Sequence, residues 1–299
     1  MKVTHVLGLC CCGVLTFCAL FGGHGRTLAR SRAAAATSPP RMVEQRPVTL
    51  KDKTELVTLN VGVTDQRNRY VPDLQTESFE VYEEGVRQPI AFFSAEDAPL
   101  SIGILLDTSA SLKRYFEQSL EAVRRLIETS HQADEFYFLT FAQAVKTQTA
   151  FSDGATVLQQ LRLPTPAGNT ALCDAVYFSL EKVRQGKYRK RALLVISDGQ
   201  DNDSRYTYQE LMRLLKEADV QIYCLGIGNT LSDGDYTTGE ALLRELAKLT
   251  GGRAFFPRNE QGLEDAANSI ALLLRHQYSL GFYPSSAPDS GWRKLKVNL

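Results

Sequence analysis

The stretch from Pro99 to Tyr115, PLSIGILLDTSASLKRY, decides the fold. Its apolar run, Ile102–Leu106, predicts a strand that is buried on both faces of a sheet. The run stops at Asp107, and two hydroxyl residues, Ser109 and Ser111, follow at alternate positions before helical spacing begins. Ligand sites of open α/β sheets form at the carboxyl ends of such strands, so this acid and these serines are the first candidates for a functional site.

The alternation of strand and helix continues to about residue 277. Further strands are predicted at 135–142, 145–151 (an edge strand), 191–198, 220–228 and 253–256. Helical spacing is found at 111–130, 156–163, 171–185, 206–218, 239–252 and 259–277. Continuously apolar strands separated by helices are typical of a doubly wound, mainly parallel α/β sheet with helices on both faces, here over residues 98–277.

Period-two patterns flank this domain on both sides. Residues 47–97 alternate in strand fashion between turn signals, and residues 278–299 predict a C-terminal β-hairpin. Neither flank is large enough to bury a core alone, so we expect the two to pair into one small β-sandwich into which the α/β domain is inserted. The last strand pattern breaks off at Leu299, which leaves open a short final strand or a truncated chain.

The N-terminus has the layout of a secretory signal. Lys2 precedes an apolar stretch from residue 3 to about 23, and small residues suited to cleavage follow near Ala29. We expect residues 1–29 to be a cleaved signal and 30–46 a linker, which predicts export to the periplasm, the cell envelope or the medium. An uncleaved membrane anchor remains the alternative, because arginines follow the apolar stretch.

Composition and motifs exclude several classes of function. Lys plus Arg and Asp plus Glu both total 34 in 299 residues, and this zero net charge argues against nucleic acid or anionic lipid as a partner. Cys173 and Cys224 lie in apolar contexts and predict buried thiols rather than a disulfide. No nucleophile elbow, phosphate loop or His-Glu-x-x-His motif occurs, and His131 and His276 lie far from the candidate loops, so we do not expect an enzyme.

Five residues form the candidate metal site: Asp107, Ser109, Ser111, Thr170 and Asp198. Taken singly, the serines and the threonine are ordinary helix caps, and Asp198-Gly199 is an ordinary turn. Their coincidence on three loops of one α/β domain favours an oxygen-ligand site for a hard cation. Asp174 is expected to support the site rather than to bind the ion, and the acidic run 198–203 lacks the spacing of a calcium loop.

This set resembles the metal-ion-dependent adhesion site of the von Willebrand factor A domain. The flanks, YVPDLQTESFEVYEEGVRQPIAFFS and QYSLGFYPS…WRKLKV, are similar to a bacterial family related to that domain and abundant in Acidobacteria. The resemblance implies that Ser109, Ser111 and Thr170 bind Mg²⁺ (or Mn²⁺ or Ca²⁺) directly, whereas Asp107 and Asp198 act mostly through water. A coordination position then stays open for an Asp or Glu carboxylate of a partner protein.

The sequence therefore predicts an exported, metal-dependent protein-binding module of the adhesion type. The alternatives are a cell-envelope scaffold that the metal merely stiffens and, less favoured, a metal-dependent hydrolase. The resemblance further suggests that the last helix, 259–277, moves when a ligand binds, as in integrin relatives.

Overall fold

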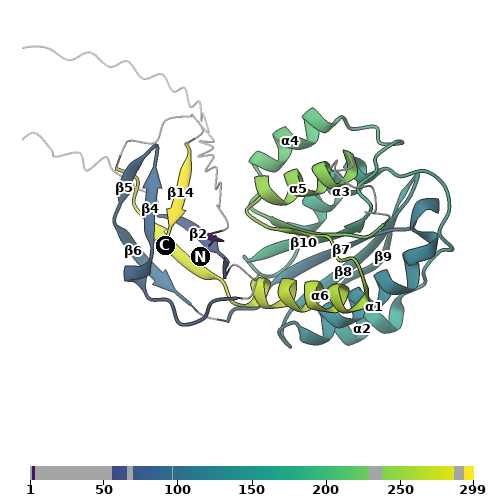
Figure 1. The fold of residues 1–299 in the computed structure, drawn as a ribbon, viewed down its shortest axis with the longest axis horizontal. Helices are drawn as coiled ribbons and strands as arrows, with labels where there is room; N and C mark the ends of the chain where they lie inside the picture. The colour runs from purple at the N-terminus through teal and green to yellow at the C-terminus, as the bar shows by residue number, and fades with distance from the viewer. Residues whose placement is uncertain (1, 4–55, 66–69, 96, 229–237, 286–292) are drawn as a thin grey trace, which may run out of the picture.

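The structure, a computed structural model, describes residues 2–3, 56–65, 70–95, 97–228, 238–285 and 293–299. The predicted signal and linker fall almost wholly outside these residues. Figure 1 shows an α/β unit and, beside it, a smaller all-β unit. None of the described helices has the length and apolar character needed to cross a bilayer.

A six-stranded sheet forms the centre of the α/β unit. Its spatial order is β12 (Ala254–Phe255), β11 (Gln221–Gly226), β10 (Arg191–Ser197), β7 (Ser101–Asp107), β8 (Glu135–Phe141) and β9 (Val145–Ser152). All neighbours pair in parallel except β8 and β9, so the predicted edge strand is antiparallel. The stretch from Pro99 to Tyr115 thus supplies β7, and every residue of this strand is buried.

Helices cover both faces of the sheet (Figure 1). Alternate residues of β7 enter opposite cores, because successive side chains of a strand point to opposite faces. Ile104 packs in the core of one face and Leu105 in that of the other. The first face carries α1 (Phe116–Thr129), α2 (Gly154–Gln160) and α6 (Glu260–Arg275), and the second carries α3 (Leu172–Val183), α4 (Tyr208–Lys216) and α5 (Thr238–Leu249).

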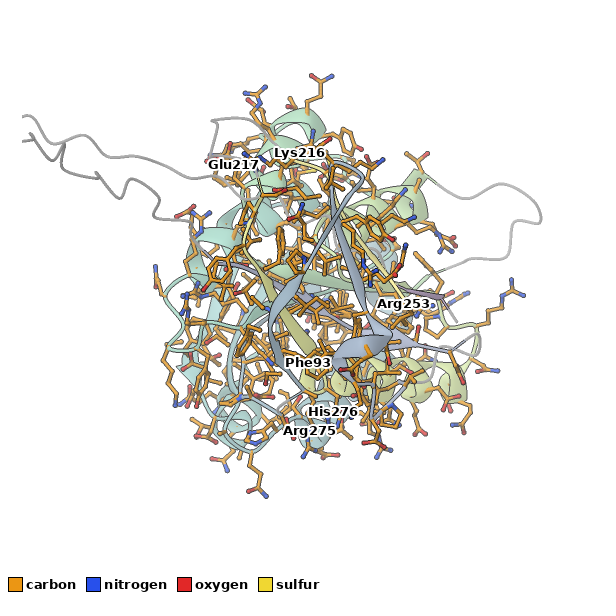
Figure 2. The ribbon with its side chains drawn as sticks, turned by 90° about the vertical axis from the view of Figure 1, so that its left-hand side faces the viewer. Phe93, Lys216, Glu217, Arg253, Arg275 and His276 are labelled. Carbon is orange, nitrogen blue, oxygen red and sulfur yellow. The ribbon has the colours of Figure 1, made fainter. Side chains whose placement is uncertain are left out.

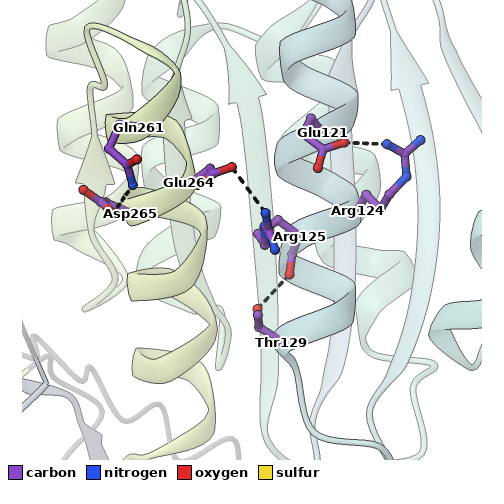
Figure 3. Close-up of polar contacts among 7 residues, drawn as sticks. All are labelled: Glu121, Arg124, Arg125, Thr129, Gln261, Glu264 and Asp265. Carbon is purple, nitrogen blue, oxygen red and sulfur yellow. Dashed lines mark hydrogen bonds and ion pairs between the residues drawn. The ribbon is translucent and has the colours of Figure 1, made fainter.

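Two details position the helices of the first face. The predicted helix from residue 111 begins as a 3₁₀ segment, η2 (Ala110–Tyr115), and only then becomes α1. The backbone N–H of Ala110, which has no partner within the helix, bonds to the Gly168 carbonyl of a neighbouring loop, and 3₁₀ turns of this kind are common at helix starts. Figure 3 shows Arg125 of α1 facing Glu264 of α6, with 3.3 Å between the guanidinium and carboxylate atoms.

The all-β unit is a sandwich of two three-stranded antiparallel sheets. One sheet orders β2 (Val57–Val61), β13 (Tyr278–Phe282) and β6 (Ile90–Ser94); the other orders β14 (Leu295–Asn298), β4 (Glu80–Glu83) and β5 (Val86–Gln88). Each sheet combines strands from both ends of the chain around one shared core. The fold-class prediction, a doubly wound α/β sheet with a flanking sandwich, is confirmed. Short elements complete the chain: β1 (Lys2–Val3), which pairs with β3 (Val63–Thr64), and η1 (Thr76–Ser78).

The predicted C-terminal hairpin is wrong. Strand β13 lies between β2 and β6, so both of its edges are already hydrogen bonded, and β14 pairs instead with β4 of the other sheet. Alternation in the sequence identifies both strands correctly. It cannot say which edge each strand meets, because that depends on strands far away along the chain, such as β6 for β13 and β4 for β14.

The two units meet at the amino ends of the parallel strands, where the side chain of Gln221, at the start of β11, donates to the Asn60 carbonyl of β2 at 3.2 Å. Figure 2 labels Arg275 and His276, which lie at the end of α6. Helix α6 ends at Arg275, whose guanidinium lies 2.5 Å from an Asp97 carboxylate oxygen. His276 stacks on Tyr70 with 5.1 Å between ring centroids, and Gln277 donates to the side-chain oxygen of Gln221 at 2.6 Å. These contacts anchor the end of α6 that leads into the sandwich.

Candidate metal centre

Backbone hydrogen bonds hold three loops together at the carboxyl edge of the sheet. The loop after β7 is joined to the loop before α3, since Ala167 donates to the Thr108 carbonyl at 2.8 Å and Ala110 donates to the Gly168 carbonyl at 3.0 Å. The loop after β10 reaches the same place, because the backbone N–H groups of residues 202 and 203 both donate to the Thr170 carbonyl at 3.0 Å. The topology therefore gathers the three segments that carry the five predicted residues.

Asp107 is fully buried at the end of β7. One carboxylate oxygen accepts the backbone N–H of Ser109 at 2.8 Å, and the other accepts the hydroxyl of Ser197 at 2.6 Å. Burial raises the pKa of Asp107 to about 6; the hydrogen bonds from Ser197 and Ser109 work against that rise, whereas the nearby charge of Asp198 adds to it. The side chain is thus oriented, and a positive charge beside it would stabilise its ionised form.

The two serines present adjacent hydroxyl oxygens. Ser109 Oγ and Ser111 Oγ lie 3.1 Å apart, with Ser109 buried and Ser111 exposed. Ser109 occupies the N-cap position of η2, yet its side chain makes no capping hydrogen bond. The helix-cap interpretation of Ser109 therefore finds no support in the described structure.

Thr170 lies buried just before α3. Its backbone N–H donates to the side-chain oxygen of Asn202 at 2.8 Å, and that of Leu172 donates to Asp201 at 3.0 Å. Residues of the acidic run thus cap this helix. The Thr170 hydroxyl does not have that task, and the sequence analysis, which only excluded a calcium loop for the run, did not find this role.

Asp198 and Gly199 leave β10 in a tightly packed turn. The Asp198 carboxylate accepts the backbone N–H of Gln200 at 3.0 Å. Gly199 has φ of 80°, and a Cβ there would lie 2.2 Å from the Gly239 carbonyl oxygen, so only glycine fits. Gly239, at the start of α5, is a supporting residue that the sequence analysis missed.

Two further side chains support the loops. Asp174 accepts the backbone N–H groups of Arg205 and Tyr206 at 2.8 and 3.0 Å, a bracing contact that agrees with its expected supporting role. Ser197 was missed: its hydroxyl donates to Asp107 and accepts the Gly199 N–H at 3.0 Å, which ties the ends of β7 and β10 together. The available signal was a hydroxyl at the end of an otherwise apolar strand.

The donor set fits a hard cation that prefers oxygen. Three hydroxyls and two carboxylates of the kinds that Mg²⁺ accepts lie on the three joined loops. The described residues contain no group of three or more His, Cys, Asp or Glu side chains arranged to hold a metal, so any site here depends on hydroxyl oxygens. Cys173 and Cys224 are both free and buried, as predicted.

A cavity of about 490 Å³ opens beside two of the candidate ligands. Ser111 and Asp198 line it together with Tyr115, Glu240 and Phe256. Its volume lies in the range of ligand pockets, about 300–1,000 Å³. A group from another molecule could therefore approach the candidate metal position from this side.

Comparison with known proteins identifies the α/β unit. Residues 101–269 match the family model described as the von Willebrand factor type A domain. A search of curated proteins finds no match. Among solved structures, the von Willebrand factor type A protein from Catenulispora acidiphila is 16% identical, with a TM-score of 0.51, and the match covers 76% of this chain and 67% of that one.

Two other matches have lower TM-scores. An aerotolerance-related membrane protein from Bacteroides fragilis is 20% identical over 57% of this chain and 98% of its own, with a TM-score of 0.46. Proximal thread matrix protein 1 from the mussel byssus, with a zinc-occupied MIDAS motif, is 16% identical over 66% of this chain and 50% of its own, at 0.49. At these identities, likeness extends to the fold alone.

Proposed function

The chain belongs to the von Willebrand factor type A domain family, and from this premise we propose that it is an exported, metal-dependent protein-binding module. Domains of this family commonly mediate protein–protein interactions. The proposed ligands of a divalent cation, Mg²⁺ or alternatively Mn²⁺ or Ca²⁺, are Asp107, Ser109, Ser111, Thr170 and Asp198. The proposed partner is a protein that supplies an Asp or Glu carboxylate.

The observation that carries this proposal is the pair of serine hydroxyls beside a buried carboxylate. Ser109 Oγ and Ser111 Oγ lie 3.1 Å apart, and Ser109 also donates its backbone N–H to Asp107. An ordinary helix start would use the Ser109 hydroxyl as a cap, but no such bond is made. Hydroxyls grouped in this way are available to a cation.

The residue types explain why a partner's carboxylate would bind. Serine and threonine hydroxyls are neutral ligands, so they compensate little of the positive charge that a bound cation supplies. Asp107, held by Ser197 and Ser109, is proposed to act mostly through water, as the family resemblance implies. An external carboxylate can then complete the coordination from the side of the cavity lined by Ser111 and Asp198.

We propose a binding protein rather than an enzyme. The two carboxylates that could act as a general base already accept hydrogen bonds, Asp107 from Ser197 and Asp198 from Gln200. His131 accepts the N–H of Ala133, and His276 stacks on Tyr70 at the other end of the sheet. Both histidines therefore lie at the amino end of the sheet, away from the candidate ligands, and neither is placed to act as a general base there, which favours binding over hydrolysis.

The domain division and the destination of the chain belong to the same proposal. We propose a signal at 1–29, a linker at 30–46, a β-rich segment at 47–97, the inserted domain at 98–277 and the sandwich strands at 278–299. The charged and then apolar start of the sequence supports export. N-terminal sequencing of the protein purified from its native cells would test it: a mature end near residue 30 is expected, and an intact Met1 would favour the anchor.

Calorimetric titration of the full chain with Mg²⁺, Mn²⁺ and Ca²⁺ tests the metal site. Saturable binding is expected in the parent and loss of binding in Asp107→Ala. Asp134→Asn is the matched control. Asp134 is also buried and accepts two backbone N–H groups, but it lies just before β8, at the amino end of the sheet and away from the candidate ligands. Equal binding by Asp107→Ala and the parent would exclude the proposed ligands.

A second experiment separates the binding module from a metal-stiffened scaffold. The probe is a labelled, flexible peptide with one Glu, compared with the same peptide carrying Gln. A binding module retains the Glu peptide only when the metal is present and releases it to EDTA. A scaffold shows a metal-dependent rise in melting temperature but treats the two peptides alike.

A further inference from the structure

A second cleft lies at the amino ends of the parallel strands, between the sandwich and the α/β unit. Its volume is about 440 Å³, within the usual range of ligand pockets. One wall is residues 56–60, which include most of β2. The facing wall consists of residues 189–191, at the entry to β10, and residues 215–221, which lead from α4 into β11. Figure 1 shows β2 on the side of the sandwich nearest the α/β unit.

Hydrogen bonds between side-chain amides hold the two walls together. Gln221 donates to the Asn60 carbonyl of β2 at 3.2 Å and accepts from Gln277 at 2.6 Å. Gln277 belongs to the short connection between α6 and β13, so this bridge joins both units. Because the edge of β2 is already occupied at Asn60, the groups that remain for a ligand are the side chains of the facing wall.

The facing wall carries an excess of positive charge. Lys216 and Glu217 lie on it at the end of α4, where Figure 2 labels them. Four cations line the cleft against two acids: Arg189, Lys190, Arg191 and Lys216 against Glu217 and Asp219. The cations therefore outnumber the acids by two, and a negatively charged ligand would complement this wall.

Arg191 is the least compensated of these charges. It begins β10 and is half-buried, and its Nε atom is enclosed without a hydrogen-bond acceptor among the described residues. Arg125 has an Nε atom in the same state, but the Glu264 carboxylate lies 3.3 Å from its terminal nitrogen. No carboxylate of the described chain forms such a pair with Arg191. A bound water or ion is the usual partner of a polar group left in this way.

We propose that this cleft binds a phosphate group, either free or carried by a small organic molecule. The planar guanidinium of Arg191 matches the spacing of phosphate oxygens, and the exposed side chains of Arg189 and Lys216 add charge beside it. A phosphate monoester carries about −1.5 to −2 at pH 7, close to the excess on the wall, whereas a single carboxylate would leave part of it uncompensated. The exposed side chain of Leu56 lines the same cleft and offers an apolar contact to an organic body.

This site is separate from the candidate metal centre. Arg191 begins β10 and Asp198 directly follows the end of that strand, so roughly 20 Å of strand lies between them. Phosphate should therefore bind without a metal ion, and its binding does not depend on the proposed function.

Calorimetric titration of the full chain in EDTA tests the proposal. The probes are phenyl phosphate, inorganic phosphate and, as a singly charged anion with the same ring, benzoate. We expect phosphate to bind saturably and benzoate to bind about tenfold more weakly than phenyl phosphate. Tighter binding of phenyl phosphate than of inorganic phosphate would support an organic phosphate as the ligand, and equal or weaker binding would support free phosphate.

Variants assign the binding to the cleft. Arg191→Gln, checked for folding by circular dichroism, should weaken phosphate binding about tenfold or more, because it removes the half-buried charge. Arg189→Gln and Lys216→Gln change exposed side chains and should each weaken it about threefold. Lys146→Gln removes the same charge from the far edge strand β9 and is the control, which should bind like the parent.

Several results would overturn the proposal. Absence of saturable phosphate binding would do so, as would undiminished binding by folded Arg191→Gln together with Arg189→Gln. An equal loss in Lys146→Gln would reduce the effect to overall charge, and equal affinity for benzoate and phenyl phosphate would remove the preference for phosphate. Phosphate binding that requires Mg²⁺ and fails in Asp107→Ala would belong to the candidate metal centre instead.

Discussion

The two ends of the central sheet are built in opposite ways. At the carboxyl end, Asp107, Ser109 and Ser111 come from five consecutive residues, and one buried charge dominates. At the amino end, Asn60, Gln221 and Gln277 come from three distant parts of the chain and form a bridge of neutral amides, beside the half-exposed ion pair of Arg275 and Asp97. Removing a hydrogen-bond partner from a buried charge strongly lowers the free energy of unfolding. Removing a neutral amide costs less, because water can replace its hydrogen bonds.

This contrast predicts the largest loss of stability for Gly199→Ala. The new Cβ would strike the Gly239 carbonyl oxygen and adopt an unfavourable φ, so we expect the free energy of unfolding to fall by about 3 kcal/mol. Urea denaturation measures it. Gly85→Ala is the matched control, because Gly85 also has φ of 80° but no atom within 4 Å of the new Cβ, and it should cost about 1 kcal/mol. Equal losses would show that the packing of Gly199 on Gly239 contributes nothing.

Ser197→Ala tests the bond that orients Asp107. Removal of the 2.6 Å hydrogen bond leaves a buried carboxylate oxygen unsatisfied and raises the pKa of Asp107 further. We expect the free energy of unfolding to fall by about 2 kcal/mol. Metal affinity should fall about tenfold, as is typical when a residue that orients a metal ligand by a hydrogen bond is removed. Calorimetry and urea denaturation measure the two effects. Unchanged affinity would mean that Asp107 needs no such support.

The pH dependence follows from the pKa of Asp107, about 6 against an ordinary 3.8. Because folding raises this pKa, ionisation of Asp107 costs stability in the metal-free chain, and this cost grows as the pH rises from about 4 to about 6. A cation favours the ionised form, so metal affinity should fall up to about tenfold per pH unit below about 6. Titrations at several pH values measure it, and Asp107→Asn should abolish the dependence if it retains any binding.

The smallest effect is expected at the amino end. Gln221→Ala removes the bridge to Asn60 and Gln277, all neutral groups, and should lower the free energy of unfolding by about 1 kcal/mol. Metal affinity, measured by calorimetry, should not change. A clear change in metal affinity would show that the two ends of the sheet are coupled. It would support the hypothesis that the last helix, α6, moves when a ligand binds.

Much of the fold was predictable because its signals are local. The buried run before Asp107 and the helical spacings predicted the sheet and its covering helices, and the alternation of the flanks predicted the sandwich. The hairpin failed because the edge that β14 meets depends on β4, over two hundred residues earlier. The 3₁₀ start of the first helix was also missed, because apolar spacing of three to four residues fits a 3₁₀ turn and an α turn alike.

By itself, the sequence determined which residue types stand on the three loops of the candidate site: Asp107, the two serines, Thr170 and Asp198, each readable from a motif of a few residues. Only the tertiary structure decided how they are held. Ser197 locks Asp107, Asp201 and Asn202 cap α3, and Gly239 packs on Gly199 because the parallel sheet brings together loops that are far apart in the chain. The cleft at β2 likewise exists only because two units close on one another, and no local pattern encodes the distance between them.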